Sequence, residues 1–561
     1  MRKPLRRIVL TALPIGLLLA APTIANNRST TRVGPEKAVL GMTVEERRAR
    51  EAGLHAWLTE ERPRGALDAP IRVELTRQEQ LDLAAPASRR AGAEPLRIGI
   101  VKSIAPAIEF TGQRHGPGGR ADGGILQATP DGGFLWTAAI TSPGATGIRL
   151  QLRNVSLPAD ADLYFYSLGG DVRGPYQGSG PDRSGEFWTN TVFSDTGVIA
   201  LRFFGPHTIE DLRAVSFAIT DLGYIGRGFP VPVEQVEWSA NQCGNANCVV
   251  DASCGGLGPA APAADAVAKM EWVQGAFIYT CTGGLIADTD GSTQRNLFLT
   301  ANHCLSKNNA NLETFFSYTT DSCEGTCPGN PSPDTTGVTV LATGRSGDFT
   351  LLELNENPPA GATFLGWNSN PIAFTNGADL YRVSNPNFGP QVFSHHAVDA
   401  NAVTCSGWPR GERIYSNDVE GATDGGSSGS PVVNAASEVV GQLSGCCGFN
   451  CGDVCDSGAN STVDGALAHY FNSVASILDP QGGGGCGSNA ECDDGQFCNG
   501  AETCSGGSCQ AGADPCPGQG CDEGANQCVG CTLLPLGASC TANAECCSNK
   551  CKGAPSNKAC R

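Results

Sequence analysis

Three residues with complementary chemistry occur in the order His303, Asp348, Ser428. Ser428 lies in a glycine-rich segment, residues 426–431, with the sequence GSSGSP. A serine hydroxyl is a weak nucleophile that needs an adjacent base. It also needs backbone N–H donors directed at the oxyanion that forms when it attacks a carbonyl. Gly426 lets this turn present its N–H beside that of Ser428. The segment therefore predicts a nucleophile, although taken alone it is equally typical of a flexible turn.

The contexts of His303 and Asp348 strengthen this interpretation. His303 follows the apolar run 296–300, which predicts a buried strand, and Asp348 precedes a second apolar run, 349–354. Taken separately, the two side chains also fit a core histidine and an ordinary strand-start carboxylate. Taken with Ser428, they have the chemistry of a general base and of the acid that orients it.

The chain order and the local motifs resemble those of chymotrypsin-fold serine proteases, and more narrowly the bacterial lysyl endopeptidase family. The resemblance covers residues 240–480, under half of the chain. The similar stretches are CVVDASC at 248–254, LTANHC at 299–304, DFTLLEL at 348–354, GSSGSP at 426–431 and VGQLSG at 440–445.

The resemblance implies two six-stranded antiparallel barrels with the three residues in the cleft between them. It assigns His303 as general base, Asp348 as its orienting acid and Ser428 as nucleophile. The N–H groups of Gly426 and Ser428 form the implied oxyanion hole. The strand that contains Ser444 and Gly445 is implied to pair with the substrate backbone.

Two positions depart from the pattern of the wider family. Many relatives of trypsin have an aspartate before the nucleophile, whereas this chain has Ser427, as lysyl endopeptidases do. Lysyl endopeptidases place an acid at the base of the primary pocket, where this chain has Thr462. Asp424, Asp456 and Asp464 lie near in sequence as replacements. Preference for a basic residue before the scissile bond (the P1 residue) is thus an expectation, and a protease of other specificity is the alternative.

Cysteine placement indicates an exported, disulfide-bonded protein. Twelve of the 26 cysteines lie between Cys243 and Cys455, and fourteen between Cys486 and Cys560. The resemblance suggests the pairs Cys281–Cys304 and Cys254–Cys323, and a bond from Cys248 to the cluster at 446–455. A zinc cluster at 446–455 is the competing interpretation.

The N-terminal part has the pattern of a signal peptide followed by a pro-segment. Residues 1–25 have the basic start, apolar stretch and small-residue end of a signal peptide. Residues 26–94 form a pro-segment with a helix expected from Thr43 to Trp57, where Thr43 and Glu46 have capping-box spacing.

Residues 95–227 alternate apolar and polar side chains in several short runs, which predicts a β-sandwich. Its position before a protease-like region suggests a propeptide, and a retained binding domain is the alternative. A maturation cut is expected within 225–245, with Arg227-Gly228 as the candidate bond.

The C-terminal part follows a helix predicted at 466–478. Residues 486–528 carry eight cysteines and few apolar side chains, so cross-links must hold them. Residues 531–560 have the cysteine order of knottins, which implies Cys531–Cys547, Cys540–Cys551 and Cys546–Cys560. A role in attachment to a surface or substrate, or in protection from proteolysis, is open for this tail.

Together the patterns predict a mainly β, secreted, extracellular serine endopeptidase that is made as a precursor and acts on proteins or peptides without a cofactor or metal. The formal net charge of −18 argues against nucleic acid or an anionic membrane as partner, and no span of the mature chain is expected to cross a membrane. An inactive protease-fold binding or adhesion protein is the rival from another class.

Overall fold

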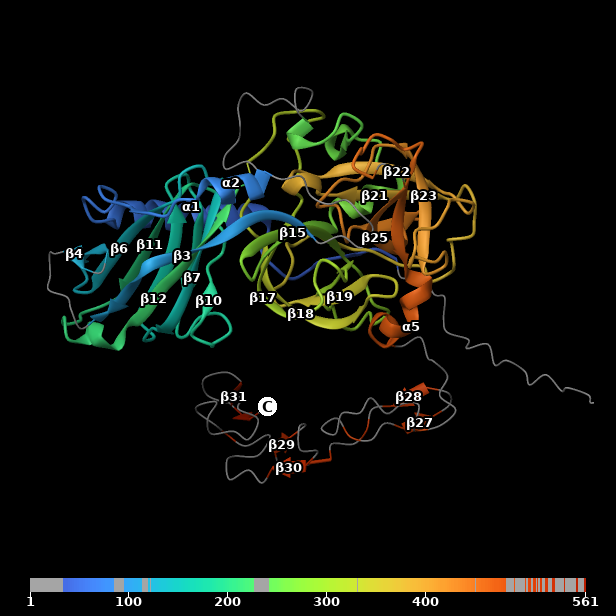
Figure 1. The fold of residues 1–561 in the computed structure, drawn as a ribbon. Helices are drawn as coiled ribbons and strands as arrows, with labels where there is room; N and C mark the ends of the chain where they lie inside the picture. Colours follow the sequence, from blue (N-terminus) through green and yellow to red (C-terminus); the bar gives the residue numbers. More distant parts are fainter. Residues whose placement is uncertain are drawn as a thin grey trace, which may run out of the picture. The chain divides into compact units, whose positions relative to one another are not determined.

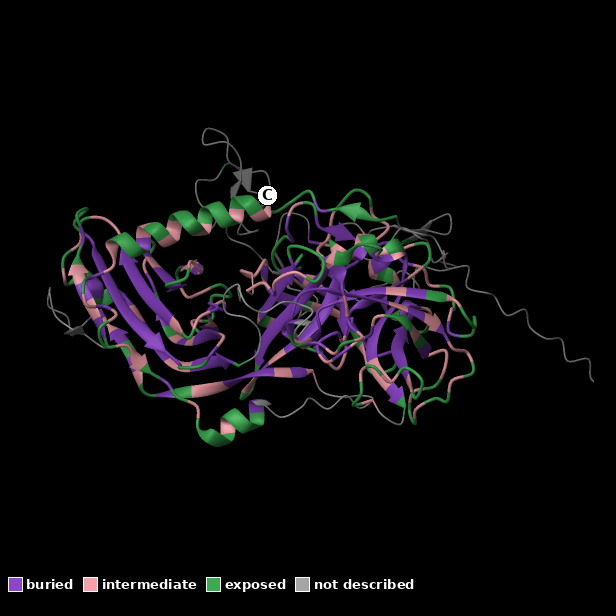
Figure 2. Cartoon of the chain, turned by 90° about the horizontal axis from the view of Figure 1, so that it is seen from above, coloured by how far each residue is buried: buried purple, intermediate pink, exposed green. Residues whose placement is uncertain are grey.

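A computed structural model describes residues 34–84, 95–112, 120–121, 123–226, 242–329, 331–448 and 451–480, with short pieces between 489 and 560. The chain divides into two compact units, Thr30–Gln481 and a second made of Met1–Ser29 with Gly482–Arg561. Strands dominate the first unit and are buried along most of their length (Figure 2). The prediction of a mainly β protein is confirmed.

Two facing sheets build the first half of the larger unit (Figure 1). One sheet has the order β4-β5-β6-β11-β8-β9, with β2 added on β6. The other contains β10-β7-β12-β3. The strands of the first are β2 (Ile71–Arg72), β4 (Arg120–Ala121), β5 (Gly124–Ala128), β6 (Phe134–Thr141), β8 (Ala161–Ser167), β9 (Val172–Tyr176) and β11 (Thr196–Phe203). Those of the second are β3 (Leu96–Thr111), β7 (Gly147–Ser156), β10 (Phe187–Trp188) and β12 (Ser216–Ile225).

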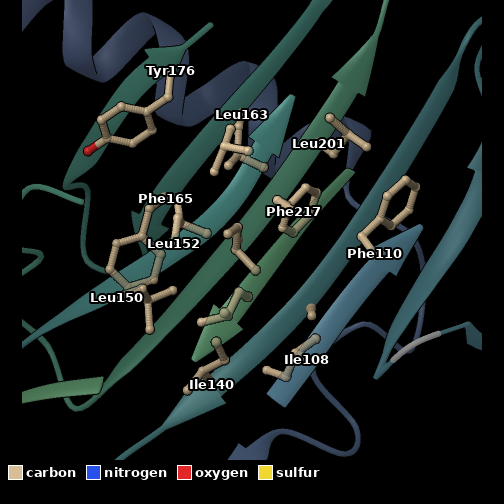
Figure 3. Packing of buried hydrophobic residues seen from close by; sticks show 14 of the residues in the cluster. Ile108, Phe110, Ile140, Leu150, Leu152, Leu163, Phe165, Tyr176, Leu201 and Phe217 are labelled. Atoms are coloured by element: carbon tan, nitrogen blue, oxygen red, sulfur yellow. The ribbon is translucent and has the colours of Figure 1, made fainter. Parts of the chain in front are cut away.

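The apolar positions of these strands meet between the sheets. Figure 3 shows Leu150 and Leu152 of β7 near Phe165 of β8, and Phe217 of β12 belongs to the same buried cluster. Alternate residues of a strand point to opposite faces, so the period-two pattern of the sequence fills one core. We call these two sheets the sandwich.

The predicted N-terminal helix is α1 (Val44–Glu61), four residues longer than expected at its C-terminal end. Thr43 and Glu46 form the predicted capping box: the Thr43 hydroxyl accepts from Glu46 N–H, and the Glu46 carboxylate accepts from Thr43 N–H. Leu58 of α1 is buried against the outer face of the sandwich. A second helix, α2 (Arg77–Ala84), precedes β3.

The second half of the unit contains two closed six-stranded antiparallel barrels, as the resemblance implied. The first closes through β15–β16 pairing and the second through β22–β23 pairing. The first barrel is β14 (Val267–Gln274), β15 (Phe277–Leu285), β16 (Leu297–Ala301), β17 (Asn309–Phe316), β18 (Thr335–Gly344) and β19 (Phe349–Leu354). The second is β21 (Asp379–Ser384), β22 (Val392–Val398), β23 (Arg413–Glu420), β24 (Pro431–Asn434), β25 (Val439–Gly448) and β26 (Asn460–Ala466).

Short elements complete the barrels. β13 (Val250–Asp251) extends the second barrel on β22. The helix α5 (Leu467–Leu478) begins one residue after its predicted start. Near the N-terminus, β1 (Glu36–Lys37) pairs with β20 (Thr363–Phe364), which places the start of the described chain on the protease half.

The sandwich and the first barrel share one ten-stranded sheet. β3 of the sandwich pairs antiparallel with β15 of the barrel from Ile100–Phe277 to Leu96–Thr280. The sheet therefore continues from one half of the unit into the other without an edge between β3 and β15.

Charged side chains are buried at the same junction. Arg149 of β7 is fully buried, and one of its guanidinium nitrogens lies 3.4 Å from Glu313 and 3.8 Å from Glu271 of the barrel. The Thr191 hydroxyl lies 2.7 Å from a carboxylate oxygen of each glutamate. Burial, with the neighbouring carboxylate, raises the pKa of Glu271 above its usual range. A sandwich residue therefore supplies one cation beside the two barrel glutamates, in addition to Lys269 of the barrel itself.

A second buried cation at this junction, Lys269 of β14 in the first barrel, is partly covered by the sandwich. The Lys269 ammonium lies 3.6 Å from the ring centroid of Phe388 and 5.6 Å from that of Phe193, which belongs to the sandwich. Burial lowers the pKa of this ammonium, and aromatic faces attract cations. Removing the sandwich would take away Phe193 and expose the Lys269 ammonium on that side.

The described pieces of the tail are three short hairpins and one disulfide. The hairpins are β27–β28 (Thr503–Ser505, Ser508–Gln510), β29–β30 (Gly520–Asp522, Gln527–Val529) and β31–β32 (Cys551–Lys552, Ala559–Cys560). Cys516 is bonded to Cys528. The predicted knottin pairings fall on residues that lie mostly outside the described ones. Among described residues, no helix has the length and apolarity needed to cross a membrane.

Candidate active site

His303 and Asp348 are brought together by the pairing of two neighbouring strands. β16 ends at Ala301, which pairs with Phe349 at the start of β19. His303 follows the first strand and Asp348 precedes the second, so both side chains lie at one end of the pair. His303 N–H donates to Asp348 Oδ1 at 3.0 Å, and His303 Nδ1 lies 2.9 Å from Asp348 Oδ2. The buried carboxylate thus fixes both the backbone and the ring of the histidine.

The second barrel also holds the turn that carries Asp348. The side-chain amide of Gln442, on β25, donates to the carbonyls of Gly347 and Asp348 at 2.9 Å each. Tyr470 of α5 donates to the Gln442 side-chain oxygen. Asp348 has a φ of 51°, in the left-handed region that few non-glycine residues adopt. Contacts from both barrels therefore determine where the carboxylate lies.

The loop of Ser428 is fixed by backbone contacts to both barrels. Thr282 N–H of β15 donates to Ser428 O at 2.8 Å, and Gly429 N–H donates to Leu443 O at 2.8 Å. Gly429 has a φ of +84°, and a Cβ there would lie 2.2 Å from Thr300 Oγ1 and 2.4 Å from Thr282 O. Only glycine fits this close approach.

Ser428, His303 and Gly426 line one hollow between the barrels. Within the described residues, neither Gly426 N–H nor Ser428 N–H donates a hydrogen bond, so both donors are unpaired in the loop. His303 Nε2 lies 3.7 Å from Cys304 Sγ, and the described contacts contain no hydrogen bond from it to Ser428. Such bonds are often long in enzymes without substrate.

The predicted substrate-binding residues also lie in this hollow. Ser444 and Gly445 of β25 and Thr462 of β26 all line it. Ser444 is 2% exposed, and its hydroxyl has no hydrogen-bond partner among the described residues. The structure therefore brings every substrate-binding candidate of the sequence to one place.

An acid that sequence reasoning missed lies beside Thr462. Asp418 of β23 lines the hollow, and its carboxylate accepts from Thr462 Oγ1 at 3.0 Å. His396 Nδ1 lies 2.8 Å from the same carboxylate, and His396 Nε2 lies 2.7 Å from Ser394 Oγ. Burial alone would raise the pKa of Asp418, but hydrogen bonds and charge from His396, with smaller contributions from its other neighbours, outweigh it, so the pKa is lowered.

The three acids considered from sequence have different fates. Asp424 and Asp456 line the hollow, whereas Asp464 is fully buried in an ion pair with Arg382 and does not line it. Asp424 accepts from Gly425 N–H and the Asn387 amide, so it serves the loop. The pairing of Ser416 on β23 with Thr462 on β26 places Asp418 in the hollow. No local sequence motif predicts this strand register.

Disulfides fasten the segments around the site. Cys281 of β15 is bonded to Cys304, next to His303, and Cys254 is bonded to Cys323. Cys248 is bonded to Cys455, which specifies its partner within the cluster. The cluster's other cysteines form Cys446–Cys451 and Cys405–Cys447. These bonds consume the thiolates that a zinc ion at 446–455 would require.

Comparison with known proteins agrees with the motif resemblance. Residues 243–459 match the family model of the lysyl endopeptidase C-terminal domain. A curated lysyl endopeptidase from Pseudomonas aeruginosa is 29% identical over 381 residues, which cover 64% of this chain and 76% of that protein.

Solved structures give a more distant likeness. The active form of the Rv3671c protease from M. tuberculosis is 17% identical, covers 42% of this chain and 91% of its own, and has a TM-score of 0.27. The HtrA-type protease AlgW with tripeptide is 16% identical, with a TM-score of 0.28. The match covers 39% of this chain and 62% of the AlgW chain. Scores this low carry no further argument. On the sequence match and the double barrel, the chain is a serine endopeptidase whose protease half is similar to the C-terminal domain of lysyl endopeptidase.

Proposed function

We propose that this protein is a secreted serine endopeptidase, made as a precursor, in which His303, Asp348 and Ser428 form the catalytic triad. The observation that carries the proposal is the shared hollow, where Ser428 lies with a histidine that a buried carboxylate holds at 2.9 Å. An inactive binding or adhesion protein needs none of these contacts.

The geometry supports acyl transfer in two stages. Ser428 Oγ attacks the scissile carbonyl while His303 takes its proton at Nε2. Asp348 accepts a hydrogen bond from His303 Nδ1–H, which keeps the imidazole in the required tautomer. The unpaired N–H groups of Gly426 and Ser428 stabilise the oxyanion. His303 then protonates the leaving amine. In the second stage, water attacks the acyl-enzyme with His303 again acting as base, which releases the acid product and restores Ser428.

Secretion and processing rest on sequence features and on the disulfides. A signal peptide at 1–25 would direct export, and disulfide bonds persist in oxidising compartments. Proteins or peptides would be the substrates. The tail remains a candidate for attachment to a surface or substrate.

A basic P1 residue is favoured by the acid in the hollow. Thr462 occupies the place of the lysyl endopeptidase acid, and Asp418 lies 3.0 Å from its hydroxyl. A carboxylate only accepts hydrogen bonds, and Asp418 accepts from Thr462 Oγ1 and pairs with His396 Nδ1, which favours its ionised form. The nearby Arg382 is already paired with Asp464. Asp418 therefore keeps a negative charge that a lysine or arginine side chain would neutralise.

Asp418→Asn tests this specificity. Losing one partner of a desolvated charge pair costs about 2–5 kcal/mol, so kcat/KM for a basic P1 should fall by about 30-fold or more. Cleavage after neutral P1 residues should change little. Mass spectrometric mapping of a mixed peptide library measures both, with Glu420→Gln as control because Glu420 is an exposed acid on the same strand and is not among the residues that line the hollow. Wild-type cleavage after glutamate or apolar residues would contradict basic specificity and leave the triad proposal intact.

The proposal also includes maturation by a cut between the sandwich and the protease half. Arg227-Gly228 lies outside the described residues, between the end of β12 and the next described segment, which starts at Gln242. We expect secreted active protein to begin within 225–245, as N-terminal sequencing will show. A start near residue 228 that disappears in Ser428→Ala indicates self-processing, and one that persists assigns the cut to another protease. Fully active protein that begins near Asn26 would contradict removal of the sandwich by processing.

A further inference from the structure

The first residues of β3 lie on the edge of β15 that also holds the nucleophile loop. Leu96 pairs with Thr280, and two residues along β15, Thr282 N–H donates to Ser428 O at 2.8 Å. Backbone groups two residues apart on a strand point to the same edge, about 7 Å apart. The sandwich strand β3 therefore starts opposite Thr280 of β15, two residues from Thr282, whose N–H holds the Ser428 loop.

Leu96 also forms part of the wall of the active-site hollow. It lines that hollow together with His303 and Ser428, and it is 4% exposed. Its side chain belongs to a buried cluster with Ile98 and Phe193 of the sandwich. The wall is thus packed on both sides and held by the continuous sheet.

A long substrate needs space on both sides of Ser428. Residues before the scissile bond are expected along Ser444 and Gly445 on β25. Residues after it leave on another side of Ser428, and an extended backbone would pair with an exposed strand edge there. The Thr280 backbone offers such an edge on β15, but Leu96 already pairs with it.

We infer that β3 occupies the place of the substrate residues that follow the scissile bond, so that the protein with its sandwich bound favours substrates with short leaving segments. This inference rests on the proposed function, because it assigns sides to a cleft that Ser428 defines. The substrate class is esters, amides and peptides cut near their C-terminal end. Proteins cut in mid-chain become good substrates only when β3 leaves β15.

A substrate series on the full-length protein tests the inference. All members share the residues up to one P1 lysine or arginine. One ends in an aminomethylcoumarin amide, and internally quenched peptides continue for one, two or four residues. We expect kcat/KM to fall by about tenfold or more between one and four leaving residues. A value that stays constant or rises with each added residue would overturn the inference.

Failure of the proposed function would look different. In that case no member of the series is cleaved, the coumarin amide included, and a fluorophosphonate does not label Ser428. Labelling together with slow cleavage of only the long peptides supports both proposals.

Leu96→Ala provides the matched variant. Shortening this wall should raise the ratio of four-residue to one-residue cleavage several-fold, whereas Glu109→Ala, an exposed site on the same strand, should leave it at the wild-type value. If folded Leu96→Ala kept the wild-type ratio of four-residue to one-residue cleavage, the Leu96 side chain would not be what obstructs the leaving segment. If that variant fails to fold, Leu96→Val makes the same comparison with a smaller expected change, and the wild-type series decides independently.

Discussion

Ser428→Ala is expected to lower kcat for peptide hydrolysis by roughly 10⁶-fold. The alanine methyl cannot attack a carbonyl, and His303 then has no hydroxyl to deprotonate. The N–H groups of Gly426 and of residue 428 remain, so a residual acceleration of about 10³–10⁴ over water is expected. Covalent labelling by a fluorophosphonate should disappear completely. Steady-state hydrolysis of the coumarin amide measures the first effect, and gel fluorescence the second.

Ser457→Ala is the control for this experiment. Ser457 is exposed and lines the same hollow, and no hydrogen bond joins it to His303 or to the Ser428 loop among the described residues. It should keep wild-type activity and labelling. Because Ser428 is half-buried and the substitution removes only its hydroxyl, thermal unfolding of Ser428→Ala should match wild type. Full activity in Ser428→Ala would refute the triad assignment.

Arg149→Met is expected to destabilise the larger unit by about 3–5 kcal/mol, the cost of leaving a buried charge without its partner. Arg149 is fully buried and lies within 4 Å of both Glu271 and Glu313. Burial already raises the pKa of Glu271, and Arg149 is the neighbour that lowers it most. Methionine would keep much of the volume and remove the charge. Urea unfolding followed by tryptophan fluorescence measures the loss.

Two comparisons make this result specific to the charge. Arg153→Met changes a half-buried arginine on the same strand, whose side chain contacts Gln151, and should cost little. Adding only Glu313→Gln to Arg149→Met should recover much of the stability, since the buried Glu271 and Lys269 then balance each other's charge. Equal stability of Arg149→Met and Arg153→Met would show that the junction does not need the cation.

Local motifs were sufficient to predict much of the site. The sequence around His303, Asp348 and Ser428 identifies each candidate because the chemistry demands specific neighbours within a few residues. The capping box of Thr43 and Glu46 is equally local, and its helix was predicted to within four residues at its C-terminal end. Alternating apolar residues likewise predicted the sandwich strands.

Features that depend on distant pairing could not be predicted. Asp418 enters the hollow through the register of β23 on β26, which no short motif encodes. Arg149 alternates with Ile148 and Leu150, so the pattern indicates a solvent-facing side chain. The first barrel covers that face, and the arginine becomes fully buried. Sequence alternation reports which residues share a face, but not whether a second domain covers it.

The ten-stranded sheet also determines how the protein would come apart after a cut. In the uncut chain, β3 and β15 separate and rejoin within one molecule, at a rate and extent independent of protein concentration. A cut within the connecting segment would turn the same pairing into the association of two chains. Its midpoint of thermal unfolding would then rise with protein concentration, because mass action favours the complex. Dilution itself would become a way to free the β15 edge.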